Sequence, residues 1–293
     1  MEKDRFAIIG TGRVGTALGV LLQLKGYTVT ALSDISQAAL ELAATRIKAK
    51  LFKDPLFMAP IADSIFITTP DDIIHEVCER LAQGGAIRSG HKIVHMSGAM
   101  GLDVLTGARF AGAHTASIHP VQSFTDAESA ILNLPGSIFG ITSDEAIREW
   151  SIKLVEELGG VPFIIPEEEK PLYHAAACIA SNYVTTLLSY AEEIYQSLGL
   201  SAEQSRSTFL PLVRGTLANI EKKGCTMALT GPIVRGDSGT VAKHIHAFRK
   251  HYPNLLNMYV QLGIMTVDLA LRSRNLSPEK AKEVRAILKG GEK

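Results

Sequence analysis

The chain has few cysteines, a single tryptophan and no excess of either charge. Its 293 residues contain three cysteines, and 30 Lys and Arg balance 30 Asp and Glu. This balance gives no overall field that would attract nucleic acid or an anionic membrane, so neither is expected as a partner. Cys78, Cys178 and Cys225 are far apart and match no zinc or redox spacing. We expect each to be a small buried hydrophobic residue in a reducing compartment.

The sequence contains no long, uninterrupted apolar run. The most apolar stretch, residues 255–271, carries Asn257, Gln261 and Asp268, which fall near one face at helical spacing. We interpret it as a buried amphipathic helix and not as a membrane span. The first four residues lead directly into a strand-like run and leave no room for a signal peptide. The sequence therefore predicts a cytoplasmic protein.

A glycine motif near the N-terminus is the strongest signal in the sequence. Phe6 to Ile9 are typical of a buried parallel strand, and Gly10, Gly12 and Gly15 follow at the spacing G-x-G-x-x-G before a helical pattern. The first glycine permits a tight turn, the second lets backbone approach a pyrophosphate, and the third allows the helix to pack on the strand. The positive end of the helix dipole would face the anion. This context predicts dinucleotide binding.

The order of elements predicts an α/β domain followed by an all-helical domain. Strand-like and helix-like stretches alternate in the first half, as a doubly wound, mostly parallel sheet requires. Beyond Pro166 only helical periodicity remains, with glycine and proline at the joints. We expect a Rossmann-like dinucleotide-binding domain over residues 1–166 and a helical substrate and dimerisation domain over residues 167–293. Helix 255–271 is apolar around most of its circumference, which favours a homodimer joined through the second domain.

Polar residues follow the ends of several predicted strands, where an open α/β sheet binds its ligand. Asp34 lies at the distance from the glycine motif at which a carboxylate bonds the ribose 2′-hydroxyl, and it would repel a 2′-phosphate. Arg13 could supply positive charge instead. The cofactor is therefore NAD or NADP, with a slight preference for NAD. The residues expected to bind it are Gly10, Thr11, Gly12, Arg13, Val14, Gly15, Ser33, Asp34, Thr69 and Pro70.

Candidate catalytic residues come from both halves of the chain. His119 follows a strand end and can exchange a proton near neutral pH, and Ser97 follows the preceding strand end. Lys170, His174 and Asn182 share one side of a predicted helix, which is either a solvated face or the wall of a cleft. We favour the cleft, because aromatic and aliphatic neighbours suggest burial. We therefore expect His174 and Asn182 to take part in catalysis and Lys170 to bind substrate.

One further segment interrupts the helical run. Residues 230–237 contain glycine, proline, Arg235 and Asp237, a composition that suits an anion-binding or interface loop. A plain interhelical turn, with Asp237 capping the next helix, is the alternative. We place Arg235 with the substrate.

Together these motifs resemble those of Rossmann-like oxidoreductases whose helical second domain carries a domain-of-unknown-function label. That group lies in the wider superfamily of pyrroline-5-carboxylate reductase, ketopantoate reductase and β-hydroxyacid dehydrogenases. The resemblance implies a nucleotide-binding domain, a helical dimerisation domain and NAD(P)-dependent oxidoreductase activity, without an established substrate. The segments that carry it are residues 8–15, 95–99, 117–120, 173–182 and 228–237.

Two details of the resemblance concern single residues. Ser97 followed by His119-Pro120 is similar to prephenate dehydrogenases, in which the histidine bonds the substrate hydroxyl. Lys170 and Asn182 are similar to a Lys and Asn of β-hydroxyacid dehydrogenases, at a wider spacing than that family's K-x-x-N. We predict an NAD(P)-dependent oxidoreductase acting on a small anionic substrate in the cleft between the domains. The alternatives are an imine reductase resembling pyrroline-5-carboxylate reductase and a non-catalytic nucleotide-binding regulatory or scaffold protein.

Overall fold

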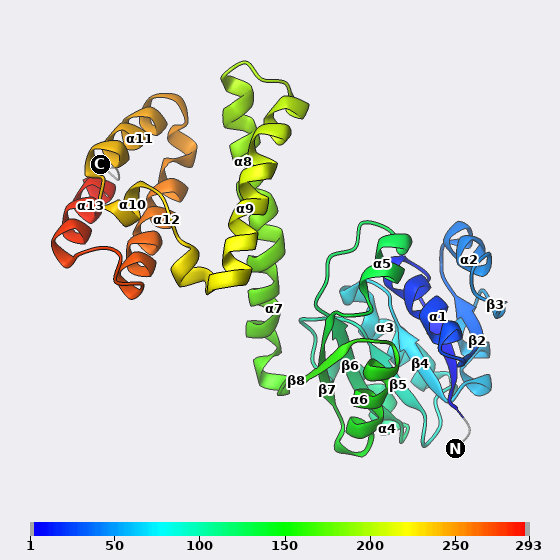
Figure 1. The fold of residues 1–293 in the computed structure, drawn as a ribbon. Helices are drawn as coiled ribbons and strands as arrows, with labels where there is room; N and C mark the ends of the chain where they lie inside the picture. The colour runs from blue at the N-terminus through cyan, green and yellow to red at the C-terminus, as the bar shows by residue number, and fades with distance from the viewer. Residues whose placement is uncertain (1–2, 291–293) are drawn as a thin grey trace. The chain divides into compact units, whose positions relative to one another are not determined.

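The structure, a computed structural model, describes residues 3–290 and consists of two compact units (Figure 1). The first unit ends at Thr186 and the second begins at Leu187. The first contains the whole β-sheet with its covering helices, and the second is helical.

An eight-stranded sheet forms the centre of the first unit, in the order β3-β2-β1-β4-β5-β6-β7-β8. The first six strands are parallel, whereas β7 is antiparallel to β6 and parallel to β8. The predicted doubly wound, mostly parallel sheet is therefore confirmed, with two reversed strands added at one edge. The strands are β1 (Arg5–Ile9), β2 (Thr28–Ser33), β3 (Lys50–Phe52), β4 (Ser64–Ile67), β5 (Lys92–His95), β6 (His114–Pro120), β7 (Ile138–Ser143) and β8 (Val161–Ile164).

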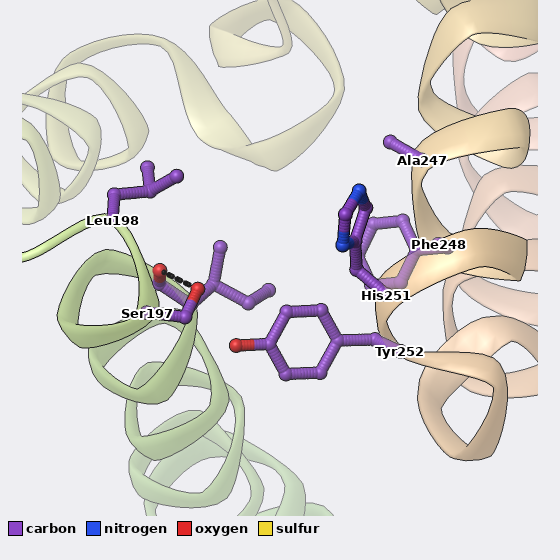
Figure 2. A pocket seen from close by; sticks show the side chains of 7 residues that line it. Ser197, Leu198, Ala247, Phe248, His251 and Tyr252 are labelled. Atoms are coloured by element: carbon purple, nitrogen blue, oxygen red, sulfur yellow. Dashed lines mark hydrogen bonds between the residues drawn. The ribbon is translucent and has the colours of Figure 1, made fainter.

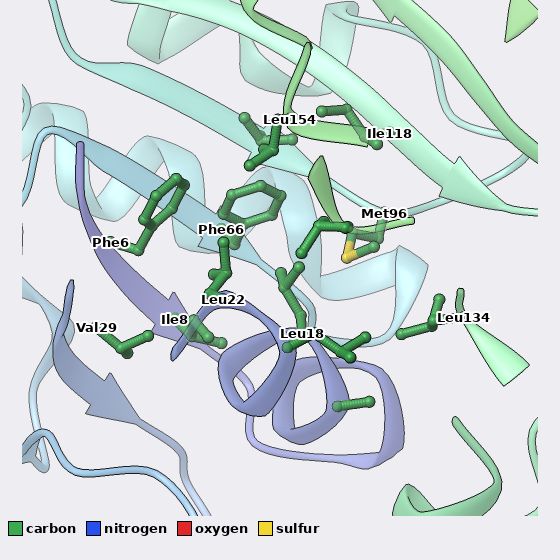
Figure 3. Close-up of a cluster of buried hydrophobic side chains, with 14 of the residues drawn as sticks. Phe6, Ile8, Leu18, Leu22, Val29, Phe66, Met96, Ile118, Leu134 and Leu154 are labelled. Atoms are coloured by element: carbon green, nitrogen blue, oxygen red, sulfur yellow. The ribbon is translucent and has the colours of Figure 1, made fainter. Parts of the chain in front are cut away.

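Helices cover both faces of this sheet, which is why its central strands are apolar on both sides. The side chains of β1 alternate: Phe6 and Ile8 face one buried cluster, and Ala7 and Ile9 face the other. Figure 3 shows the first cluster, where Phe66 of β4 lies beside Phe6. The helices of this unit are α1 (Arg13–Leu24), α2 (Gln37–Ala44), α3 (Asp71–Gln83), α4 (Thr106–Phe110), α5 (Ala127–Asn133), α6 (Arg148–Glu157) and α7 (Lys170–Cys178).

After the sheet the chain is helical through to residue 290, as predicted. A π-helical segment, Ile179–Tyr183, joins α7 to α8 (Val184–Ser197), so the predicted helix that carries Lys170, His174 and Asn182 is present with one widened turn. The expected domain boundary at residue 166 falls just after β8. The compact first unit, by contrast, continues through α7 to Thr186. The boundary at 166 stays a prediction.

The second unit has its own apolar core. Val260 and Val267 of α12 are fully buried, together with Val241 of α11 and Val284 of α13. Its helices beyond α8 are α9 (Ala202–Ala228), α10 (Pro232–Arg235), α11 (Ser238–His251), α12 (Pro253–Arg272) and α13 (Pro278–Gly290). Among residues 3–290, no helix combines the length and the apolar character that crossing a bilayer requires.

Candidate functional site

The three glycines of the G-x-G-x-x-G motif, where β1 leads into α1, differ in what their surroundings require. Gly10 has φ +95°, and a Cβ there would lie 2.8 Å from the backbone of Thr68. A Cβ at Gly15 would lie 2.5 Å from Oγ1 of Thr68 and closer still to the carbonyl of Gly10, so only glycine lets α1 pack here. Gly12 differs, because its φ of −70° suits any residue and a Cβ would have no atom within 4 Å. Packing does not require glycine at position 12, and the open space fits close approach by a phosphate.

The start of α1 offers further features that suit an anionic cofactor. Gly12 at the N-cap provides no side-chain hydrogen bond to the helix, and no acidic residue lies in the first turn. The first amide groups of such a helix lack partners within it, and the helix dipole favours a negative charge there. At the end of β4, Oγ1 of Thr69 is buried without a hydrogen-bond partner among the described residues. These features fit the phosphate and sugar groups of a dinucleotide.

Asp34 ties the end of β2 to the glycine loop. Its carboxylate accepts hydrogen bonds from the backbone N of Thr11 at 2.6 Å, from Oγ1 of Thr11 at 3.0 Å and from the backbone N of Ser36 at 2.8 Å. Ser33 is buried, and its carbonyl accepts from the backbone N of Gly10. The side chain that reaches the loop is therefore Asp34, with Ser33 acting through its backbone. Arg13 is exposed and donates to the carbonyl of Phe124 at 3.3 Å.

His119 and His174 lie side by side in the first unit. His119 stands near the end of β6 and His174 on the first turns of α7, with ring centroids 5.7 Å apart and ring planes at 77°. Both rings pack on Gly98, where a Cβ would lie 2.6 Å from Nδ1 of His174 and 2.8 Å from Nε2 of His119. Oη of Tyr173 lies 2.9 Å from Nδ1 of His119, on the far side of that ring. Both histidine rings therefore lie against Gly98, where a larger residue would not fit.

Burial changes the protonation of this group. It lowers the pKa of His119 to about 4, with help from the neighbouring His174, Lys170 and His95, so the ring is neutral at physiological pH. Burial also raises the pKa of the Tyr173 hydroxyl to about 12, which keeps that group protonated. The neutral imidazole of His119 and the neutral hydroxyl of Tyr173, each able to donate and to accept, thus share a hydrogen bond.

A hollow of about 470 Å³ opens beside the two histidines, within the first unit. Asn182 and Ser181 lie on its exposed rim, and Cys178 lies one helical turn after His174 on the same face. Among the described residues that line it, none is Asp, Glu, Lys or Arg. The lining residues are His119, Val121, Gln122, Ser123, His174, Ala177, Cys178, Ala180, Ser181 and Asn182. The hollow therefore offers hydrogen-bond donors and acceptors from His, Gln, Ser and Asn side chains.

Two predicted site residues lie outside this lining. Oγ of Ser97 donates to Oδ2 of Asp71 at 2.7 Å and accepts from the backbone N of Ala99 and of Met100, so it closes the turn after β5. Lys170 is fully buried, and its Nζ donates to Oγ of Ser117 at 2.7 Å and to the carbonyl of Ser97 at 3.3 Å. Burial lowers the pKa of Lys170 to about 8, against the opposing charges of Glu167 and Asp71. In this structure Lys170 joins α7 to the middle of β6 and to the turn after β5.

Arg235 belongs to the second unit and ends α10. Asp237, two residues later, accepts from the backbone N of Thr240 at 3.0 Å and so caps α11. A separate, mostly apolar hollow of about 370 Å³ lies in this unit between the ends of α8 and α11. Figure 2 shows the ring of Tyr252 directed across it towards Ser197.

Some residues at the hollow were not predicted from the sequence. The expectation that every cysteine is buried was wrong: only Cys78 is, whereas Cys225 is exposed and Cys178 lines the hollow. Sγ of Cys178 lies 3.6 Å from Nε2 of His174. The i, i+4 spacing of the two residues was the available signal. The role of Tyr173 depends on the approach of α7 to β6, which no local pattern encodes.

The comparisons with known proteins agree with this architecture. Residues 2–120 match the family model of a Rossmann-like domain, and residues 137–266 match that of a domain of unknown function, DUF2520. Among curated protein sequences there is no match. A solved structure of a protein from Thermotoga maritima is 27% identical with a TM-score of 0.73, covering 92% of this chain and 99% of that one.

Two further solved structures share the fold at lower identity. A Bacteroides fragilis protein assigned as an NADP oxidoreductase is 19% identical with a TM-score of 0.73, covering 90% of this chain and 98% of that one. A pyrroline carboxylate reductase from Plasmodium falciparum, with NADP bound, is 14% identical with a TM-score of 0.60, covering 98% and 99%. The resemblance predicted from the sequence is thus confirmed: a Rossmann-like domain is followed by a helical domain of unknown function.

Proposed function

We propose that this chain is an NAD(P)-dependent oxidoreductase that acts on a small substrate held beside His119 and His174. One observation carries the proposal. The glycine loop leaves open space at Gly12, where packing alone would tolerate a side chain, over a helix N-terminus that lacks a side-chain cap. In the same unit, a hollow whose described lining holds no Asp, Glu, Lys or Arg contains a pair of imidazoles. The first feature suits a dinucleotide and the second suits proton transfer.

Some of the proposed cofactor residues would contact phosphate through their backbone amides, and others would contact the sugar. When bound, a nicotinamide dinucleotide supplies or accepts a hydride. The amides from Thr11 to Gly15 would hold the pyrophosphate, and Asp34 would accept from ribose hydroxyls. Both oxygens of Asp34 already accept from backbone donors, which fixes the carboxylate in place. Because its charge opposes a 2′-phosphate, we propose NAD as the preferred cofactor.

His119 is proposed as the group that exchanges the proton. Its Nδ1 is held by Tyr173, so Nε2 remains for a substrate. Ser181 and Asn182, on the rim of the hollow, would orient the rest of the substrate through neutral hydrogen bonds. We propose an anionic substrate because the segment that contains Arg235 has a composition that suits anion binding. The lining itself offers donors but no fixed cation.

A non-catalytic nucleotide-binding protein would use the same glycine loop but would not need the two histidines. The proposal is tested by incubating the purified protein with NADH, and separately with NADPH, and a panel of small carbonyl compounds while following absorbance at 340 nm. Turnover that falls by about 10²–10⁴-fold in His119→Ala, with cofactor affinity nearly unchanged, is the expected result. Tight dinucleotide binding with equal, negligible turnover in both proteins would favour the regulatory alternative.

We also propose a homodimer joined through the second unit. That unit leaves several large apolar side chains exposed, among them Leu212 and Leu217 of α9 and Leu262 and Met265 of α12. Contact with a second copy would remove them from water. Light scattering at micromolar concentration should give twice the monomer mass.

A further inference from the structure

We infer that Arg13 couples the dinucleotide site to the hollow beside His119 and His174, because it holds a segment of chain that lines this hollow. Arg13 follows Gly12 as the first residue of α1, and the segment is residues 121–126, which come directly after β6. In this role Arg13 is a positioning residue. The inference rests on the proposed function and deepens it, because it names how the cofactor acts on the substrate side.

One hydrogen bond joins the glycine loop to the segment. Nη1 of Arg13 donates to the backbone carbonyl of Phe124 at 3.3 Å. A guanidinium carries five N–H groups in a planar fork. Among the described residues, Arg13 makes no other hydrogen bond and no ion pair. Its remaining N–H groups can therefore bind an anion, beside the amides that we propose hold the pyrophosphate.

The segment passes the start of α1 on its way from β6 to α5. Helix α5 continues the segment and lies on α1, where Leu134 of α5 packs with Leu18 of α1 in one buried cluster (Figure 3). Glu128, also on α5, forms an ion pair with Arg46, just beyond α2. This course from the edge of the hollow to the outer helices brings the middle of the segment to Arg13.

Little else holds the segment in place. Val121 and Gln122 border two hollows, the one beside the histidines and a second of about 460 Å³ next to the start of β7. The side chains of the segment are exposed except that of Phe124, which packs against the first core cluster. A stretch with few buried contacts opens at a low free energy. Its order therefore depends on Phe124 and on the bond from Arg13.

An anion at the glycine loop would strengthen this bond through entropy. The exposed side chain of Arg13 loses rotamer freedom when it bonds the carbonyl of Phe124. A phosphate that already fixes the guanidinium removes most of that cost, so the bond forms more often. The fork allows both partners at once, because phosphate and carbonyl use different N–H groups.

The coupling acts on the substrate because Val121, Gln122 and Ser123 line the hollow. When the segment is held, these residues are fixed before a substrate arrives, and less ordering remains for the substrate to complete. By linkage, a substrate that fixes the segment must raise the affinity for the cofactor by the same factor. The cofactor therefore prepares the hollow.

Hydrogen–deuterium exchange of the peptide that covers residues 121–126, read by mass spectrometry at short labelling times, tests this coupling. Saturating NADH, set for each protein by fluorescence titration, should slow the exchange of the wild type by about 2–10-fold, the factor that one net hydrogen bond contributes. Arg13→Met, which keeps the length of the side chain without its donors, should show no slowing. Arg46→Met removes the ion pair of α5 outside the glycine loop and should slow as the wild type does.

A second variant covers the case in which Arg13→Met binds NADH too weakly to be saturated. Arg13→Lys keeps the charge but lacks the planar fork, so it should bind NADH and yet slow the exchange less than the wild type. Wild-type exchange that NADH leaves unchanged or accelerates overturns the coupling, as does equal slowing in both Arg13 variants or loss of slowing in Arg46→Met. A wild type that binds neither NADH nor NADPH refutes the proposed function itself, which the titration shows separately.

Discussion

The rings of His119 and His174 meet edge to face, with centroids 5.7 Å apart, although one belongs to a strand of the sheet and the other to a helix that follows it. This meeting depends on α7 lying against β6 and the turn after β5. Lys170 holds it there, since its buried Nζ reaches Oγ of Ser117 and the carbonyl of Ser97. The histidine pair and the buried lysine are therefore parts of one arrangement.

Gly98 should be sensitive to a single added methyl group. In Gly98→Ala the new Cβ would lie 2.6–2.8 Å from ring atoms of both histidines, so the rings must move apart. We expect a loss of about 1–3 kcal/mol in the free energy of unfolding, typical of overpacking, and altered ¹⁵N shifts of both histidines. Gly215→Ala, at a helical glycine with no atom within 4 Å of the added Cβ, is the matched control. Unchanged histidine shifts in Gly98→Ala would contradict the packing described.

Stability should fall in mild acid because buried histidines resist protonation. Burial lowers the pKa of His95 from 6.5 to about 4. Between these values the unfolded chain binds a proton that the folded chain excludes. The contribution of His95 to the free energy of unfolding is therefore complete above pH 6.5 and lost as pH falls towards 4. For the fully buried His95 it amounts to at most about 3 kcal/mol.

Urea unfolding at several pH values between 4 and 7 measures the slope of the free energy of unfolding against pH. His95→Gln, which keeps a donor for the carbonyl of Gly101 but does not titrate, should flatten it. His75→Gln, at an exposed histidine, should not. Equal slopes in all three proteins would show that His95 does not control the acid response.

Asp34→Ala should reveal the basis of cofactor preference. The change removes the acceptor for the backbone N and Oγ1 of Thr11 and the negative charge beside the proposed ribose site. We expect weaker binding of NADH and a shift of preference towards NADPH. Fluorescence titrations with both cofactors measure it. A wild type that already prefers NADPH would show that the charge of Asp34 does not set the preference.

The sequence predicted the sheet well because its strands are buried and apolar. The strand expected from Phe6 to Ile9 is present as β1, whereas the short helices α4, α5 and α10 were not anticipated, since fewer than eight residues give no clear period. His119 and His174 were both predicted to take part in catalysis, and the structure brings their rings together. Their roles remain predictions.

The surroundings of the two histidines could not be predicted. Lys170 was expected to bind substrate, but the direction of a long side chain depends on packing, and here it turns inwards to Ser117. The hydroxyl of Tyr173 meets His119 only through the tertiary approach of α7 to β6. Cys178 was interpreted as core because its type and spacing matched no motif.

Gly12→Val tests the central claim most directly. Position 12 has an ordinary φ and open space where a Cβ would lie, so the fold should tolerate valine, with circular dichroism and urea midpoint close to those of the control Gly215→Val. The isopropyl group would fill the space proposed for the pyrophosphate. Titration of each protein with NADH, followed by fluorescence, should show binding to the wild type and to Gly215→Val and none to Gly12→Val. Undiminished NADH binding by a folded Gly12→Val protein would contradict the assignment of the glycine loop as the dinucleotide site.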